Sequence, residues 1–266
     1  MSWYANAMQS PFATRINYDV QAEILLACTD SNKQINPPRS RHVKKIILAS
    51  LFVTSPFCSV AYAGDKEPTP VLSELRDQGK SISSITPIFS QLLMFSVPKG
   101  FTPVFEKNQG IQYVQEYVLE GQSTKLWSQM LSISGAKNLA NLPNISPQKF
   151  IDGMANGFKH DCPDSFNSVT LGTMKIDGFD AYASILSCGI AMPAAFPYSE
   201  SALIVAVQGA KDYYTIQWAE RGAASKVALA IDTALWKDRM NKVNPIRLCP
   251  IVAGEAAPYA SCAERK

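Results

Sequence analysis

"SVTLGTMKIDGFDAYASILSCG", residues 168–189, decides the fold class of this chain. Asp177-Gly178 supplies the positive φ angles of a tight turn between two runs that are long enough to be strands. The residues expected to share one face of the second strand are Phe179, Ala181, Ala183 and Ile185. The stretch therefore predicts a long hairpin, and hairpins imply antiparallel pairing.

Further hairpins are predicted on both sides of this one. Residues 201–220, "SALIVAVQGAKDYYTIQWAE", read as two strands joined by a turn near residues 208–212. Upstream, "LLMFSVPKGF" (residues 92–101) reads as a strand, and the alternating residues 111–121 pair across a turn at 107–110. Between these hairpins, we expect a turn of helix around Trp127, followed by a strand from Met130 to Ser134.

Two helices are predicted. Ser146 is a good N-cap, and Pro147 occupies the first helical position, where its missing N–H costs nothing. Pro163 ends this helix, whose apolar stripe consists of Phe150, Ile151, Met154 and Phe158. A last helix is expected over residues 225–242, with one face formed by Val227, Ile231, Ala234 and Leu235.

This order of elements predicts an α+β fold with helices packed on an antiparallel sheet. We expect residues 91–266 to form a single domain, and the polar, proline-containing residues 64–90 to form a flexible lead-in to it.

Residues 43–63 have the pattern of a secretory signal peptide. Arg41, Lys44 and Lys45 supply positive charge, and residues 46–60 form an apolar run. Ala61-Tyr62-Ala63 is an A-x-A site, which predicts cleavage between Ala63 and Gly64. The alternative is an uncleaved anchor, but the run is shorter than the roughly 20 residues that span a membrane.

A signal so far from Met1 suggests a wrongly assigned start. If translation begins at Val43, read as methionine, residues 1–42 are a translated leader without a folded structure. Other codons than AGG, AGY and GTG at positions 39, 40 and 43 would contradict this hypothesis.

Charge argues against nucleic acid as a partner. The chain has 25 basic and 22 acidic residues, and loss of residues 1–63 leaves 19 of each. A neutral chain without basic clusters does not favour nucleic acid or an anionic membrane surface. We expect contact with the membrane only transiently, through the signal peptide.

Four cysteines remain after cleavage, which allows three disulfide connectivities. We expect Cys162 to pair with Cys188, and Cys249 with Cys262, because the second pair brackets a loop that closes easily. The C-terminal tail would then be closed by a disulfide. Zinc is the alternative, but no C-x-x-C occurs and His160 is the one histidine after residue 63.

"FSVPKGF" (residues 95–101) and "EYVLEGQSTKLWSQML" (residues 116–131) resemble the opening of small exported bacterial proteins of the PsbP/DcrB-like superfamily. The resemblance covers residues 92–243. It implies an α-β-α sandwich around an antiparallel sheet and a non-catalytic accessory or binding role, with no common catalytic residues. The C-terminal cysteine loop is not a general feature of that superfamily.

Two short motifs suggest chemistry. "KHDCPD" (residues 159–164) holds His160, Asp161, Cys162 and Asp164, and a thiol beside a histidine is a candidate nucleophile. A disulfide at a helix end is the alternative for Cys162. Ser134 and Lys137 match S-x-x-K, but neither S-D-N nor K-T-G follows. We therefore assign no catalytic residue, metal or cofactor, and keep His160, Asp161 and Asp164 as functional candidates.

The sequence favours a periplasmic or secreted, non-catalytic binding protein that recognises a protein or envelope component through its sheet face or tail loop. The alternative is an exported enzyme of hydrolase type with a dispersed active site. Most aromatic residues of the predicted strands should be core; the set is Tyr113, Tyr117, Trp127, Tyr182, Tyr213, Tyr214 and Trp218.

Overall fold

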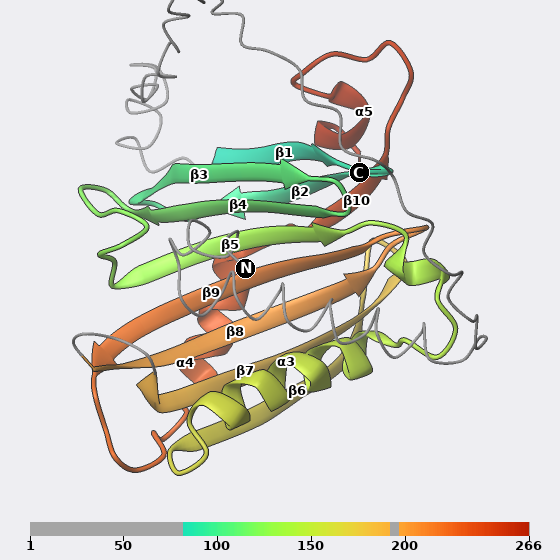
Figure 1. The fold of residues 1–266 in the computed structure, drawn as a ribbon. Helices are drawn as coiled ribbons and strands as arrows, with labels where there is room; N and C mark the ends of the chain where they lie inside the picture. The colour runs from blue at the N-terminus through green and yellow to red at the C-terminus, as the bar shows by residue number, and fades with distance from the viewer. Residues whose placement is uncertain (1–81, 192–196, 266) are drawn as a thin grey trace, which may run out of the picture.

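A computed structural model describes residues 82–191 and 197–265. The predicted leader, the signal peptide with its cleavage site, and residues 64–81 of the lead-in lie outside this range. The described residues form two antiparallel sheets with a few helices packed on them (Figure 1), which confirms the α+β class.

The larger sheet has seven strands, in the order β3-β4-β5-β9-β8-β7-β6. Their bounds are Phe101–Gln109 for β3, Gln112–Leu119 for β4, Gln129–Ala136 for β5, Phe166–Ile176 for β6, Phe179–Ala191 for β7, Tyr198–Gln208 for β8 and Tyr213–Ala223 for β9. Neighbouring strands pair antiparallel throughout, so the hairpins predicted at residues 168–189 and 201–220 are present. Upstream, the predicted strand at residues 92–101 lies mostly in a second sheet, and β4 pairs instead with β3. Asp177 and Gly178 have φ angles of 52° and 87°, as the β6–β7 turn requires.

The smaller sheet has three strands, in the order β1-β2-β10. Their bounds are Ile82–Ile88 for β1, Gln91–Val97 for β2 and Arg247–Pro250 for β10. β1 pairs along its whole length with β2, so the expectation of a loose lead-in up to residue 90 is wrong from Ile82 onward. Five of the seven β1 residues are partly or fully exposed, in keeping with the polar character of the segment.

Four helical segments complete the described fold. They are the 3₁₀ turn η1 at Leu139–Asn141, α3 at Pro147–Asp161, α4 at Thr233–Val243 and α5 at Ala260–Ala263. Ser146 caps α3, because its hydroxyl accepts a hydrogen bond from the Lys149 amide at 3.2 Å. This helix begins and ends as predicted.

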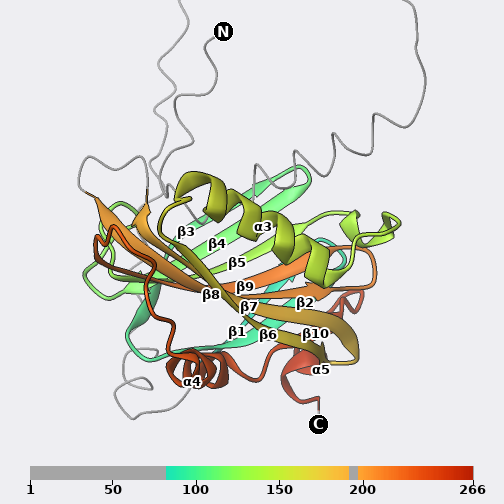
Figure 2. The same ribbon diagram turned by 90° about the horizontal axis from the view of Figure 1, so that it is seen from below.

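The large sheet is covered differently on its two faces (Figure 2). α3 packs on β6, β7 and β8 on one face, and the second sheet together with α4 covers the other. The main core fills the space between the two sheets, where Phe101 meets Trp218 edge to face. A second core lies under α3. The layers are thus one helix, a large sheet, and a small sheet with α4.

Two helix predictions need correction. Residues around Trp127 form bends instead of a helical turn. The last helix begins at Thr233 and not at residue 225, because Asp232 caps it by accepting hydrogen bonds from the amides of Ala234 and Leu235. Residues 225–231 instead bond to β6 and β7, and Val227 and Leu235 of the predicted apolar face are exposed. The buried residues of α4 are Trp236, Arg239 and Val243.

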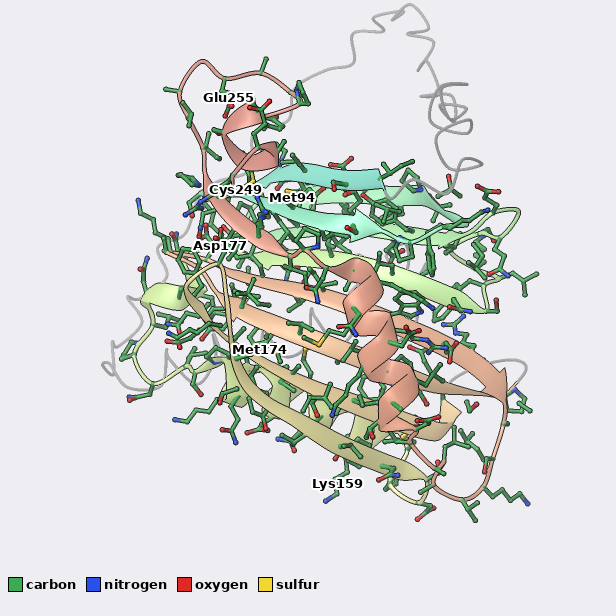
Figure 3. The ribbon with its side chains drawn as sticks, turned by 180° about the vertical axis from the view of Figure 1, so that it is seen from behind. Met94, Lys159, Met174, Asp177, Cys249 and Glu255 are labelled. Atoms are coloured by element: carbon green, nitrogen blue, oxygen red, sulfur yellow. A yellow bond between two sulfur atoms is a disulfide. The ribbon has the colours of Figure 1, made fainter. Side chains whose placement is uncertain are left out.

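The tail crosses back to the small sheet. β10 pairs with β2, and Cys249 lies near Met94 at the edge of this sheet (Figure 3). Arg265 forms an ion pair of 3.0 Å with Asp177, which ties the end of the tail to the β6–β7 turn.

A candidate binding site beside helix α3

Both disulfides form with the predicted pairing. Cys162 at the end of α3 is bonded to Cys188 of β7, with a Cα–Cα distance of 5.9 Å. Cys249 of β10 is bonded to Cys262 of α5, with a Cα–Cα distance of 5.6 Å, which closes the tail loop. Two disulfides indicate an oxidising, extracytoplasmic location. Among the described residues, no helix is long and apolar enough to cross a membrane.

The KHDCPD cluster does not assemble a nucleophile. The sulfur of Cys162 is consumed by its disulfide, and the His160 ring is 88% exposed and contacts only its neighbour Asp161, at 3.2 Å. Asp164 is exposed. In the described part of the chain, no three His, Cys, Asp or Glu side chains are grouped closely enough to hold a metal ion.

The S-x-x-K pair is also separated. Ser134 lies in β5, and its hydroxyl is 2.6 Å from the Thr215 hydroxyl on the α3 side of the sheet. Lys137 follows the strand and lies 5.8 Å from the Phe89 ring, which packs against the core on the other side. A serine and a lysine three residues apart share a face on a helix, but not on a strand.

The face of the large sheet beside α3 instead carries a set of buried polar side chains. Strand residues alternate between faces, so residues two apart share one. Since Met130, Ala219 and Ala202 pack in the core under α3, the alternation places a polar set on the same face. The set comprises Glu116 of β4, Ser132 and Ser134 of β5, Thr215, Gln217 and Arg221 of β9, and Glu200 of β8.

These polar residues lie beside α3 and not beneath its centre. Among the described helices, α3 is the one on this face, and it covers β6, β7 and β8 (Figure 1). Ser132 and Gln217 are direct partners across β5 and β9. We call the residues Ser132, Ser134, Thr215 and Gln217 the polar strip.

Next to the polar strip lies a charged cluster, which we call the Arg221 cage; it consists of Trp127, Tyr198, Glu200 and Arg221. The Arg221 guanidinium carbon lies 3.6 Å from the centre of the Trp127 ring and 4.1 Å from that of Tyr198. Its Nε donates a hydrogen bond of 3.1 Å to Glu200 Oε2. Glu200 and Arg221 are direct partners across β8 and β9.

Burial dominates the electrostatics of the Arg221 cage. The Glu200 side chain is fully buried, and this burial raises the pKa of its carboxyl from 4.5 to about 7, although the Arg221 charge acts to lower it. Burial also raises the pKa of the Tyr198 hydroxyl, and the nearby Glu200 charge adds to that effect.

This face is distinguished by buried polar atoms that have no hydrogen-bond partner. Among the described residues, six buried side-chain nitrogen or oxygen atoms have no hydrogen-bond partner. Five of them belong to the polar strip and the Arg221 cage: Trp127 Nε1, Ser132 Oγ, Glu200 Oε1, Gln217 Nε2 and Arg221 Nη2. Native proteins satisfy nearly all buried polar groups, so a cluster of five unpaired atoms requires an explanation.

Elsewhere in the protein, buried polar groups do have hydrogen-bond partners. Asp212 is 1% exposed; its Oδ2 accepts from the amide and hydroxyl of Ser90, and its Oδ1 accepts from the Asn138 amide. In the tail loop, Glu255 is not buried, and its two carboxylate oxygens accept from the amide and hydroxyl of Ser261. The tail loop, the other predicted recognition surface, contributes no unpaired buried atom to the described set.

Sequence reasoning missed Glu200 and Arg221, although their pairing was within reach. A turn that pairs Gln208 with Tyr213 also pairs Glu200 with Arg221, because antiparallel partners keep a constant sum of residue numbers. The available signal was that opposite charges occupy paired positions on two neighbouring strands. Trp127 was predicted as core and is 5% exposed; the other predicted core aromatic residues are buried as well.

Comparison of the chain with models of known protein families and with curated proteins finds no match.

Proposed function

We propose that this protein is an exported, non-catalytic binding protein of a bacterial envelope, which holds an extended polypeptide segment on the sheet face beside α3. The location is periplasmic or secreted, after cleavage of the signal peptide behind Ala63. The likeness to the PsbP/DcrB-like superfamily belongs to the same proposal, with a small sheet and α4 in place of one helical layer.

One observation motivates the proposal, namely the five unpaired polar atoms on one face, which are buried in the described structure and become accessible to a ligand only when this face opens. Leaving a buried donor or acceptor unpaired costs about 1 to 3 kcal/mol, so such a cluster is retained at the expense of stability. Three of the five atoms, on Trp127, Gln217 and Arg221, can only donate. A ligand that fills this face must therefore be rich in acceptor oxygens.

The spacing of these atoms favours an extended polypeptide. Gln217 and Arg221 lie four residues apart on β9, which corresponds to about 14 Å. An extended chain presents carbonyl oxygens on one side with the same two-residue repeat as the strand below it. A segment of about four residues lying along β9 would offer an acceptor to each of these two donors.

A peptide selection tests this function. The protein, purified from an oxidising compartment, is used to enrich binders from a phage-displayed library of random heptapeptides at pH 8. We expect the natural sequence to enrich a peptide family, and the double variant Ser132→Ala, Gln217→Leu to lose that enrichment.

The matched control changes a serine and a glutamine on the other side of the large sheet. Ser84 and Gln115 both hydrogen bond in the network around Tyr117, so the variant Ser84→Ala, Gln115→Leu should keep the enrichment. Absence of any enriched family would overturn the proposal, as would binding of purified peptidoglycan in place of peptides.

A further inference from the structure

The described part of the chain has an open cavity of about 380 Å³ at the end of the large sheet where β6 turns into β7. One wall is the end of β6 with its turn, residues 175–177, and the other is the link between α4 and β10, residues 244–247. Unlike the buried atoms of the Arg221 cage, this cavity is accessible to solvent. Its volume lies at the lower end of the range for small-molecule sites, so it suits a ligand of a few carbon atoms.

The end of the tail bridges the two walls. The Arg265 side chain forms an ion pair of 3.0 Å with Asp177, and the Arg265 carbonyl accepts a hydrogen bond from Arg247 Nη1. Figure 3 shows Asp177 close to Cys249 of β10, and the Cys249–Cys262 disulfide holds the tail beside this strand. Three segments that are distant in sequence thus fix the shape of the cavity.

Part of the lining is apolar. Ile176 and Ile246 both line the cavity, and both belong to the main core between the two sheets. Pro245 adds an apolar ring from the link between α4 and β10. A ligand with an aliphatic stem would therefore remove apolar surface from water on both sides of the contact.

The charges at the cavity do not cancel. Lys175 pairs with Asp180 across β6 and β7 at 2.7 Å, and Asp177 pairs with Arg265. Arg247 has no carboxylate partner among the described residues, because its Nη1 is bonded to a neutral carbonyl. Three cations thus face two carboxylates, which leaves one positive charge without an opposite charge.

Arg247 is held in place without being covered. It pairs with Met94 across β10 and β2, and its bond to the tail orients the guanidinium. The residue is partly exposed and lines the cavity. A guanidinium carries five N–H groups in a planar fork that matches the two oxygens of a carboxylate. One bond to the tail leaves further N–H groups of this fork for a ligand.

We propose that this cavity binds a small carboxylic acid as its anion, with the carboxylate on Arg247 and an aliphatic stem against Ile176 and Ile246. A single negative charge matches the one uncompensated cation, whereas a phosphate dianion would bring a charge in excess beside Asp177. A free acid and the C-terminal residue of a polypeptide share this chemistry. The inference goes beyond the binding face beside α3 and does not depend on it.

An NMR titration tests the cavity. The full chain, purified from an oxidising compartment and labelled with nitrogen isotope, is titrated at pH 7 with isocaproate, with N-acetylleucine and with the neutral isocaproamide. We expect saturable shifts of the Asp177 and Arg247 amide signals with a carboxylate probe. Isocaproamide should bind at least about tenfold more weakly, since a hydrogen bond between charged groups is lost. Tighter binding of isocaproate identifies a free acid as the source, and tighter binding of N-acetylleucine identifies a chain end.

Two substitutions should change the affinity for the tighter carboxylate probe in opposite directions. Arg247→Gln removes the binding charge and should raise the dissociation constant at least about tenfold. Asp177→Asn removes a carboxylate from the lining and should lower the constant about two- to fivefold. Asparagine, like aspartate, tolerates the φ angle of 52° at this position. Lys125→Gln is the matched control, because it changes the net charge as Arg247→Gln does but precedes β5, at the opposite end of the large sheet.

Several results would overturn the carboxylate site. Shifts that do not saturate with either carboxylate would do so, as would an isocaproamide that binds as tightly as isocaproate. An unchanged dissociation constant in Asp177→Asn would also overturn it, even where Arg247→Gln fails to fold. An equal loss of affinity in Lys125→Gln would show a general effect of charge and not a site. The peptide selection tests the proposed function separately.

Discussion

Two arginines of this protein have nearly the same surroundings on opposite faces of the large sheet. Arg221 stacks on Trp127 and Tyr198 and pairs with Glu200, on the α3 side. On the other side, Arg239 lies over two tryptophan rings, 4.3 Å from the centre of Trp236 and 5.5 Å from that of Trp218, and pairs with Glu220.

The two clusters differ in what they connect. Arg239 comes from α4 and reaches Glu220 of β9, so its ion pair joins a helix to the sheet. Arg221 and Glu200 both belong to the sheet and are already held by the strand pairing. The first ion pair therefore fastens two layers, whereas the second adds little to the connectivity of the fold.

The two clusters also differ in how many of their buried polar atoms have a hydrogen-bond partner. Trp218 Nε1 donates a hydrogen bond of 3.0 Å to Gln129, but Trp127 Nε1 has no partner. The Arg239 cluster has one unpaired buried atom, Nη1, and the Arg221 cage has three. Similar local chemistry is thus almost fully paired on one face and leaves three buried atoms unpaired on the other.

Replacing Arg221 and Arg239 one at a time should give the largest difference in stability between the two faces. Arg221→Met keeps an unbranched apolar side chain but leaves the fully buried Glu200 without its partner, which costs about 3 to 5 kcal/mol of unfolding free energy. Arg239→Met should cost less, about 1 to 2 kcal/mol, because Glu220 is 28% exposed and can be hydrated. Urea denaturation at pH 8 measures both. A larger loss in Arg239→Met would contradict the contrast.

Removing either disulfide should give the next largest effect on the free energy of unfolding. Loop entropy assigns about 3.5 kcal/mol to Cys162–Cys188, with a sequence separation of 26, and about 3 kcal/mol to Cys249–Cys262, with 13. Serine pairs at both sites should therefore destabilise similarly in thermal unfolding. Only the first pair should also weaken peptide binding, since it supports the Arg221 cage. Equal binding losses in the two variants would argue against that support.

The pH dependence should give the smallest effect. The folded-state pKa of Glu200, about 7, lies above the ordinary value of 4.5, so the folded state holds this proton more tightly. Its contribution to stability is complete below about pH 4.5 and is lost as the pH rises through 7; it amounts to roughly 3 kcal/mol in total, most of which falls between pH 5 and 8.

Arg221 is the ionisable group that acts on the pKa of Glu200 in the cage, and Glu200 in turn raises the pKa of Tyr198. Glu200→Gln should remove this part of the pH dependence between pH 5 and 8, and Glu220→Gln is the comparison on the other face. Superimposable stability profiles of the natural protein and Glu200→Gln would refute the assignment.

The parts of the fold that were predicted correctly from the sequence are those that depend on local signals. The Asp177-Gly178 turn, the Ser146-Pro147 helix start and the β8–β9 turn each depend on a few adjacent residues. β10 was missed because it is stabilised by pairing with β2, from which it is separated by about 150 residues of chain. No local pattern encodes the contact between β10 and β2. β1 and β2 are joined by only Phe89 and Ser90, and β1 was missed because its residues read as polar.

The site was harder to predict, because it depends on which face each strand turns toward α3. Ser134 and Lys137 match S-x-x-K in spacing alone, and because Ser134 lies in a strand, as predicted, the two side chains do not share a face. Glu200 and Arg221 could have been paired from the turn alone, but their burial and their unpaired atoms follow from tertiary packing.

The most direct measurement is the stability of Ser132→Ala, Gln217→Leu beside its peptide binding. If these polar atoms are kept for a ligand, apolar replacements relieve an unsatisfied burial, and the free energy of unfolding should rise by about 1 to 2 kcal/mol while binding is lost. A variant that is less stable than the natural protein would show that the two side chains serve the fold, and would contradict the binding face.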